Sequence, residues 1–176
     1  MGFDLSSIAS TLLSSDALDG IVSSTGASKN DITSVLSSAL PSLLGGAAKQ
    51  STGKDTASSF ASALEHHASN STSNLLSFFK NVDAADGGKI VGHLLGGDKD
   101  ATAEKVAKQT GVDPKTVVKI LAVAAPLLMS LLGKKTNEAK KEDKTSTTAS
   151  LAQALLGSAS SGKLDVGDIL GSLLKK

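Results

Sequence analysis

The residues best suited to metal chemistry are the three histidines, and their spacing does not favour a metal site. His66 and His67 are adjacent, so on a helix their rings point in different directions, whereas paired ligands on one helix stand four residues apart. Glu65 could join them only through an irregular backbone, and His93 lies alone. The chain has no Cys, which excludes disulfides and thiolate ligands. We therefore expect no metal and no other cofactor.

Calcium binding and nucleophilic catalysis are also disfavoured. Asp83, Asp86 and Gly87 resemble part of a calcium-binding loop, but its alternating acidic ligands and closing Glu are missing, so an Asp/Gly turn is the better interpretation. Serine is abundant, yet there is no Gly-x-Ser-x-Gly segment and no His with an obvious carboxylate partner. Glycine pairs such as Gly45-Gly46 lack the frame of a phosphate-binding P-loop. We predict that the protein is not an enzyme and has no small-molecule substrate.

Residues 106–121 have the pattern of a helix-turn-helix, in which Lys115, Thr116 and Lys119 would face the major groove of DNA. The other interpretation is that the turn only joins two packed helices. We favour the second, because the helix becomes wholly apolar after Lys119 and DNA binding needs a basic face for phosphate contacts. The net charge is +1 and Arg is absent, which also disfavours a dedicated phosphate or DNA reader. Nucleic acid is therefore not the expected partner.

The elements that would position these residues are organised around one apolar stretch, Thr116 to Leu132. After Lys119 its apolar residues point in every direction around a helix, so other elements or lipid must bury it. Spanning a bilayer takes about 20 such residues. This run is shorter and contains Pro126 and Ser130. We predict a central core helix, capped by Asp113, and no transmembrane segment.

The spacing of apolar residues in the remaining chain predicts helices, and no segment has the alternation typical of a strand. The predicted fold class is therefore all-α. Aromatic residues make up only 2% of the sequence, so Leu, Ile, Val and Ala must form the core. Pro41 is expected to kink or restart the third helix, Gly45-Gly46 to end it, and residues 83–88 to form a turn. The expected helices are 4–13, 16–24, 28–44, 60–67, 74–80, 88–95, 101–109, 114–132, 150–156 and 164–174.

The strongest internal signal is a duplication. Thr25-Gly26-Ala27-Ser28 aligns with Thr110-Gly111-Val112-Asp113, and Gly111 follows Gly26 by 85 residues. When this offset of 85 residues is applied to the residues that follow, the apolar positions of two long helices align, and so do their prolines, Pro41 and Pro126. The sequence therefore predicts two tandem helix-turn-helix-like repeats.

A second pattern occurs three times, at 6–13, 88–95 and 167–174. Its common form is small-x-Ile-apolar-small-x-Leu-Leu, and we call it the packing motif. Small residues four apart lie on one helix face, where they would let another backbone approach closely. The first two copies each precede a long kinked helix, whereas the third is followed by the end of the sequence. The third copy is thus an unmatched packing helix.

Several of these segments together resemble the YidB-like bacterial proteins, a family named as a domain of unknown function. They are the Thr-Gly entry into a long helix with a central proline, the Leu-Pro-Ser-Leu-Leu-Gly-Gly segment at 40–46, and Gly92-His93-Leu94-Leu95-Gly96. The resemblance covers about residues 5–133 and implies an all-α fold of helix-turn-helix-like units. It implies no activity. The charged segment and the last two helices are less typical of the family.

The predicted organisation follows from the repeats and from composition. It comprises a first helical repeat at 1–50, connecting helices at 51–87, a second helical repeat at 88–135, a charged linker at 136–149, and a C-terminal helical extension at 150–176. The N-terminus has no basic region followed by a long apolar region, so no secretory signal is expected. The bacterial cytoplasm is the expected compartment, while export to the cell surface by a leaderless route stays open.

For function, we predict a non-enzymatic structural protein that self-associates into a filament or other homopolymer. The unmatched helix would complete the groove of a neighbouring chain, so the expected partner is the protein itself. The other interpretation is that this helix folds back on its own domain. A DNA- or protein-binding regulatory module at 106–121 is the alternative function. The predicted self-association residues are Leu164, Val166, Gly167, Ile169, Leu170, Gly171, Leu173 and Leu174.

Overall fold

The computed structural model of the protein describes residues 5–143, with side chains for 6–137; residues 1–4 and 144–176 lie outside the described part. Helices and short connections make up all of this described range, without a strand, which confirms the all-α fold class. The elements are α1 (Leu5–Leu12), α2 (Ser15–Thr25), α3 (Lys29–Thr52), α4 (Ala57–Ala68), α5 (Leu75–Lys80), α6 (Ala84–Leu95), the 3-10 turn η1 (Gly96–Asp98), α7 (Lys99–Thr110) and α8 (Pro114–Asp143).

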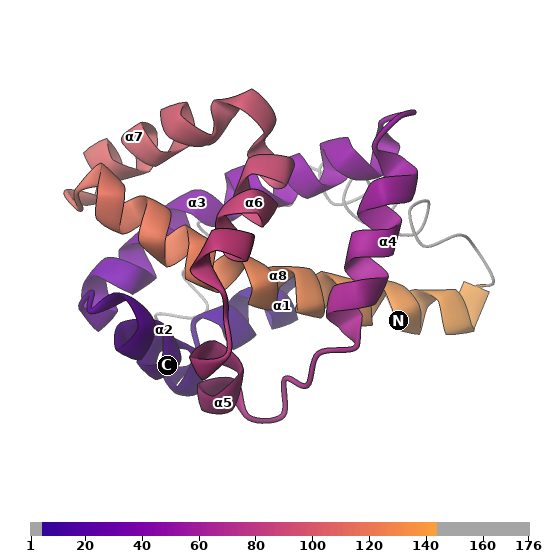
Figure 1. Cartoon of the computed structure of the whole chain (residues 1–176), viewed down its shortest axis with the longest axis horizontal. Helices are drawn as coiled ribbons and strands as arrows, with labels where there is room; N and C mark the ends of the chain where they lie inside the picture. The colour runs from indigo at the N-terminus through magenta and orange to yellow at the C-terminus, as the bar shows by residue number, and fades with distance from the viewer. Residues whose placement is uncertain (1–4, 144–176) are drawn as a thin grey trace.

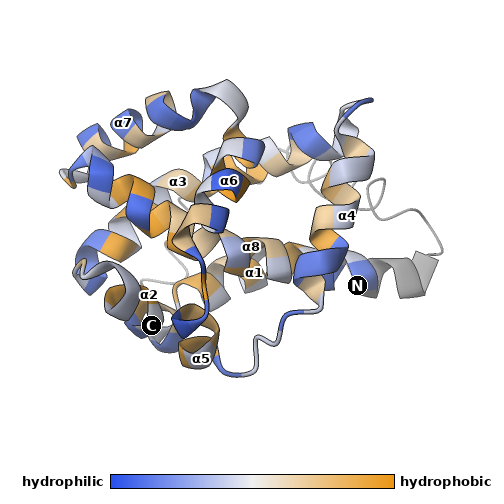
Figure 2. Ribbon diagram, viewed as in Figure 1, coloured by the Kyte–Doolittle hydropathy of each residue, from blue (hydrophilic) through white to orange (hydrophobic). Residues whose placement is uncertain are grey.

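Helix α8 runs through the middle of the molecule, and the other helices lie around it (Figure 1). Its most extensive contacts are with α6 and α4, and α1, α2, α3 and α7 also pack against it. Every residue from Ile120 to Ser130 is buried. The prediction of a central core helix is therefore confirmed. In Figure 2 the ribbon of α7 is coloured as hydrophilic at several positions along its length.

By length and apolar composition alone, residues 114–137 of α8 could cross a membrane. In the structure, however, 78% of the most apolar window of this helix is buried by the rest of the protein. The core helix of a soluble protein meets the same criterion of length and composition, so this feature is weak evidence for a membrane span.

The two turns predicted to be equivalent have the same hydrogen bonds. Gly26 and Gly111 end α2 and α7 with φ angles of 75° and 76°, a left-handed conformation that glycine adopts without strain. In each turn the threonine hydroxyl donates to the carbonyl four residues earlier, at 2.7 and 2.8 Å, and accepts the N–H two residues later, at 3.2 and 3.3 Å. Asp113 then caps the following helix, as predicted, and Ser28 caps α3 at the equivalent position. The equivalence of the two whole repeats stays a prediction.

Glycines allow the closest contacts between helices. A Cβ atom built on any of three glycines would lie nearer than 3.0 Å to a carbonyl oxygen of a neighbouring helix. The pairs are Gly46 with Leu94, Gly87 with Ala122, and Gly133 with Leu64. The second pair has a further cause, because Pro126 has no N–H to donate to the Ala122 carbonyl four residues earlier. That carbonyl is thus free to face the backbone of Gly87.

Three local predictions were wrong. Gly45-Gly46 does not end the third helix, since α3 continues to Thr52 with Gly46 packed against α6. Residues 83–88 do not form a turn, because Asp83 accepts a hydrogen bond from the Ala85 N–H (2.8 Å) and so caps α6. The small residues of the second packing motif, Gly88 and Gly92, face open space, and the adjacent Gly87 makes the close contact instead.

The predicted charged linker also differs from the structure at its start. Helix α8 continues through residues 136–143, and Thr136 is fully buried with its hydroxyl donated to the Leu132 carbonyl at 2.7 Å. The rest of the linker, 144–149, lies outside the described residues, as does the whole C-terminal extension. The apolar packing of α8 therefore reaches further along the chain than composition indicated.

Candidate functional site

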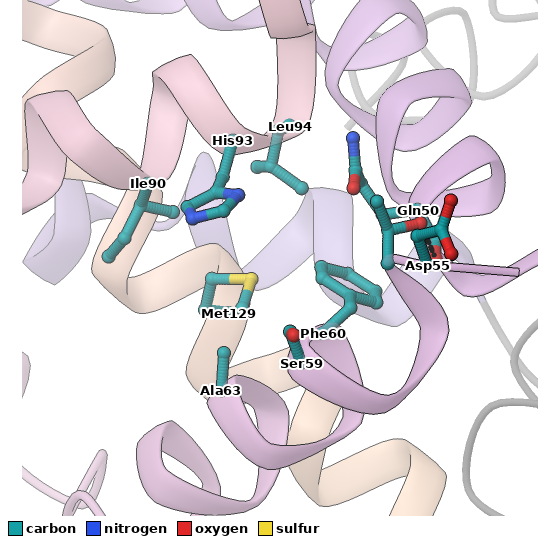
Figure 3. Close-up of a pocket in the computed structure, with 10 residues that line it drawn as sticks. Gln50, Asp55, Ser59, Phe60, Ala63, Ile90, His93, Leu94 and Met129 are labelled. Atoms are coloured by element: carbon teal, nitrogen blue, oxygen red, sulfur yellow. Dashed lines mark hydrogen bonds between the residues drawn. The ribbon is translucent and has the colours of Figure 1, made fainter. Parts of the chain in front are cut away.

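An apolar pocket opens between α4, α6 and α8, with a volume of about 210 Å³. We call it the apolar pocket. Figure 3 shows side chains from these three helices facing the same space. Its apolar lining consists of Phe60 and Ala63 from α4, Ile90 and Leu94 from α6, and Met129 from α8. The unbranched Met side chain is flexible, which suits a surface that must adapt to an inserted group.

Polar residues surround this apolar lining. They are Gln50, Asp55, Thr56, Ser59 and His93. The Thr56 hydroxyl donates to the Gln50 carbonyl at 2.9 Å and so fixes the connection between α3 and α4 beside the pocket. His93 is exposed at its position on α6. An apolar centre with a polar rim is the usual anatomy of a protein–protein contact.

The two described copies of the packing motif bury the same positions. The buried residues are Ile8, Ala9 and Leu12 in α1, and Ile90, Val91 and Leu94 in α6. The last motif residue is partly buried in each copy, at Leu13 and Leu95. Both helices pack against α8. In this fold the motif is therefore the apolar face with which a helix joins the core.

The residues predicted to mediate self-association all lie outside the described part of the chain. They are Leu164, Val166, Gly167, Ile169, Leu170, Gly171, Leu173 and Leu174. The described residues therefore bear on this prediction only through the first two copies of the packing motif.

The predicted helix-turn-helix is formed by α7, the turn at Gly111, and the start of α8. Lys115 and Lys119 are exposed, but Thr116 is half-buried and its hydroxyl donates to the Asp113 carboxylate. This hydrogen bond is the main reason that the pKa of Asp113 is lowered. Because α8 is buried from Ile120 onward, only its first turns are open to a partner. That is a short surface for a recognition helix, which must lie in a groove.

Lys115 and Lys119 belong to a shallow hollow that sequence reasoning missed. Lys89 from α6 and Lys99 from the start of α7 complete the cationic lining of a space of about 480 Å³, which we call the lysine hollow. Its other lining residues are Ala84, Ala85, Gly88, Val118 and Ala122. The only sequence signal was the solvent-side position of Lys89 in the packing motif, since the meeting of three helices is a tertiary property.

His93 lines the apolar pocket, whereas His66 and His67 line neither the apolar pocket nor the lysine hollow. His66 is exposed and His67 half-buried on α4, and both line an open hollow that Asp83 and Asp86 also line. Among the residues that the structure describes, no three His, Asp or Glu side chains are placed to hold a metal ion. Burial lowers the pKa of His67, the neighbouring His66 lowers it further, and Asp86 partly opposes both effects.

The fold is an all-α helical domain built on one buried helix, α8. Residues 8–135 match the family described as bacterial protein of unknown function (DUF937). The match covers most of the chain, so the chain belongs to this family, in agreement with the resemblance to YidB-like proteins. Comparisons with curated proteins and with solved structures found no match.

Proposed function

We propose that this is a non-enzymatic structural protein that self-associates, forming a filament or other homopolymer through residues 164–174. The observation that carries the proposal is the common burial of the packing motif in α1 and α6. By alignment, the third copy has Ile169, Leu170 and Leu173 at the three buried positions. A helix with this face is stable only where another surface removes it from water.

The apolar pocket is the acceptor that we assign to this face. Its volume of about 210 Å³ exceeds the cavities of about 150 Å³ that accommodate a benzene-sized group, so a leucine or isoleucine side chain fits. Its lining from α4, α6 and α8 is apolar, and its rim is polar. Insertion of one chain's C-terminal segment into the pocket of the next is a heterologous contact, which produces rings or open filaments.

The buried hydroxyl groups support a structural role. Ser51, Ser130 and Thr136 each donate to the carbonyl four residues earlier in their own helix, at 2.9, 2.9 and 2.7 Å. Hydroxyls used in this way satisfy their donor capacity within their own helix, so they can be buried in the core.

The test compares the intact protein with a truncation after Gly162, by negative-stain electron microscopy and by light scattering over a range of concentrations. We expect rings or filaments from the intact protein and dispersed particles after truncation. Leu173→Asp should abolish assembly in the full-length chain, because it places a charge at a buried motif position. Ser172→Asp is the matched control, since the equivalent positions are the partly exposed Thr11 and the exposed His93. Dispersed monomers of the intact protein would contradict the proposal.

A regulatory module that binds DNA or protein through 106–121 is the second candidate, favoured by the exposed Lys115 and Lys119. Such a DNA-binding protein should retard a duplex in a gel at low salt and release it as salt rises. Lys115→Gln and Lys119→Gln should each reduce this retardation. Absence of retardation at low salt would remove DNA as the partner.

A further inference from the structure

We infer that the lysine hollow binds a compact anion of the phosphate class, a function separate from self-association. Four lysines from three helices line one hollow: Lys89 from α6, Lys99 from α7, and Lys115 and Lys119 from α8. No carboxylate side chain lines this space. The hollow therefore concentrates more positive charge in a small space than a single exposed lysine does.

The charge of this site contrasts with the rest of the molecule. The chain as a whole is nearly neutral, with 18 basic and 17 acidic residues. Elsewhere an exposed lysine can pair with a carboxylate, as Lys29 does with Asp19 at 2.5 Å. Within the described residues, none of the four lysines of the hollow forms such an ion pair. Like charges around one space repel one another, and an anion between them replaces this repulsion with attraction.

The shape of the hollow favours a compact group. Its other lining residues are the small residues Ala, Gly and Val, and a Cβ atom built on Gly88 would meet nothing within 4 Å. The four lysines line a hollow of about 480 Å³ and come from three helices, so they do not follow one another along a single helix. A phosphate or diphosphate group fits such a space better than the backbone of a long duplex does.

The residue type defines what the site would recognise. Lysine acts as a point charge on a flexible stem, whereas Arg provides the planar fork that selects carboxylate or phosphate geometry. A site made only of lysines should therefore rank ligands by charge and size. We expect inorganic pyrophosphate to bind more tightly than monovalent anions such as chloride or acetate, with affinity that falls as salt rises.

The experiment is calorimetric titration of the full-length protein with inorganic pyrophosphate, between about 50 mM and about 200 mM salt. We expect one site per chain and weaker binding at higher salt. The variant carrying Lys89→Gln and Lys119→Gln should bind about tenfold more weakly. The control carries Lys54→Gln and Lys80→Gln, which removes the same charge from exposed lysines outside the hollow. All three proteins should have the same thermal denaturation midpoint, because the substituted side chains are exposed.

A second arm identifies the source of the phosphate group, using vesicles of phosphatidylglycerol and of phosphatidylcholine. Binding to the anionic vesicles alone, competed by pyrophosphate and lost in the hollow variant, supports the site and assigns it to lipid headgroups. Pyrophosphate binding without vesicle binding supports the site and assigns it to a free anion. The inference would be overturned if pyrophosphate did not bind at low salt, or if the control variant lost as much affinity as the hollow variant. It would also be overturned if the protein bound duplex DNA and pyrophosphate did not displace it.

Discussion

Two neighbouring glycines in α6 have opposite surroundings and should respond oppositely to alanine. A Cβ atom at Gly87 would lie 1.6 Å from the Ala122 carbonyl oxygen, whereas one at Gly88 would meet nothing within 4 Å. We expect Gly87→Ala to lower the free energy of unfolding by about 1–3 kcal/mol, because α6 and α8 must separate. Gly88→Ala should raise it by about 0.5–1 kcal/mol through helix propensity. Urea denaturation measures both, and equal effects would contradict the assigned contact.

His67 should make stability depend on pH below neutrality. Its folded-state pKa is lowered from 6.5, first by burial and then by His66, although Asp86 opposes this. The unfolded chain therefore binds a proton more readily than the folded chain does. Stability is full above pH 6.5 and falls as pH drops from 6.5 toward the lower folded-state pKa.

The corresponding test is thermal denaturation of wild type and His67→Gln between pH about 8 and about 5.5. The variant should lose less stability over this range than wild type, because the glutamine side chain does not titrate. An unchanged pH dependence in the variant would show that other groups cause it.

At the level of helices and turns, Gly26 and Gly111 are expected to be equally important. Both have φ angles near 75°, and an L side chain in this left-handed conformation is strained. Gly26→Ala and Gly111→Ala should each lower the free energy of unfolding by about 1–2 kcal/mol. Gly45→Ala in α3 is the control, since this glycine is helical and has open space around it, and it should be neutral or stabilising. Sensitivity at only one turn would contradict the equivalence of the two turns.

Local chemistry predicted these helices well wherever a signal is complete within a few residues. The caps at Ser28 and Asp113, the glycine turns and the apolar stretch of α8 are all of this kind. The errors arose where tertiary contacts override a local signal. A glycine pair usually ends a helix, but here Gly46 lies inside α3 and allows its backbone to approach Leu94 of α6 closely.

The candidate sites were less accessible to sequence reasoning. Lys115 and Lys119 were identified, but as parts of a DNA-reading helix, because nothing local indicated that Lys89 and Lys99 lie beside them. The apolar pocket was missed for the same reason, since α4, α6 and α8 contribute its lining from distant parts of the chain. Periodicity predicts which face of a helix is apolar, but it does not predict where the packing of three helices leaves a pocket between them.

For the molecule as a whole, the organisation around α8 explains how one motif could serve both folding and assembly. Helices α1 and α6 carry the packing motif and are buried against α8 within the same chain. A third copy, at 167–174, has the same apolar residues at the corresponding positions. Self-association would reuse this intramolecular contact between chains.

Sedimentation velocity on a mixture of two full-length variants tests this claim most directly. Leu173→Asp removes the C-terminal apolar face, and Ala63→Phe fills the apolar pocket that Ala63 lines. Each variant alone lacks one half of the head-to-tail contact and should sediment as a monomer, whereas wild type forms larger species. Mixed together, they retain one intact segment and one intact pocket, so we predict a 1:1 dimer. A mixture that sediments only as monomers, or a wild-type protein that is monomeric at all concentrations, would contradict assembly through these two surfaces.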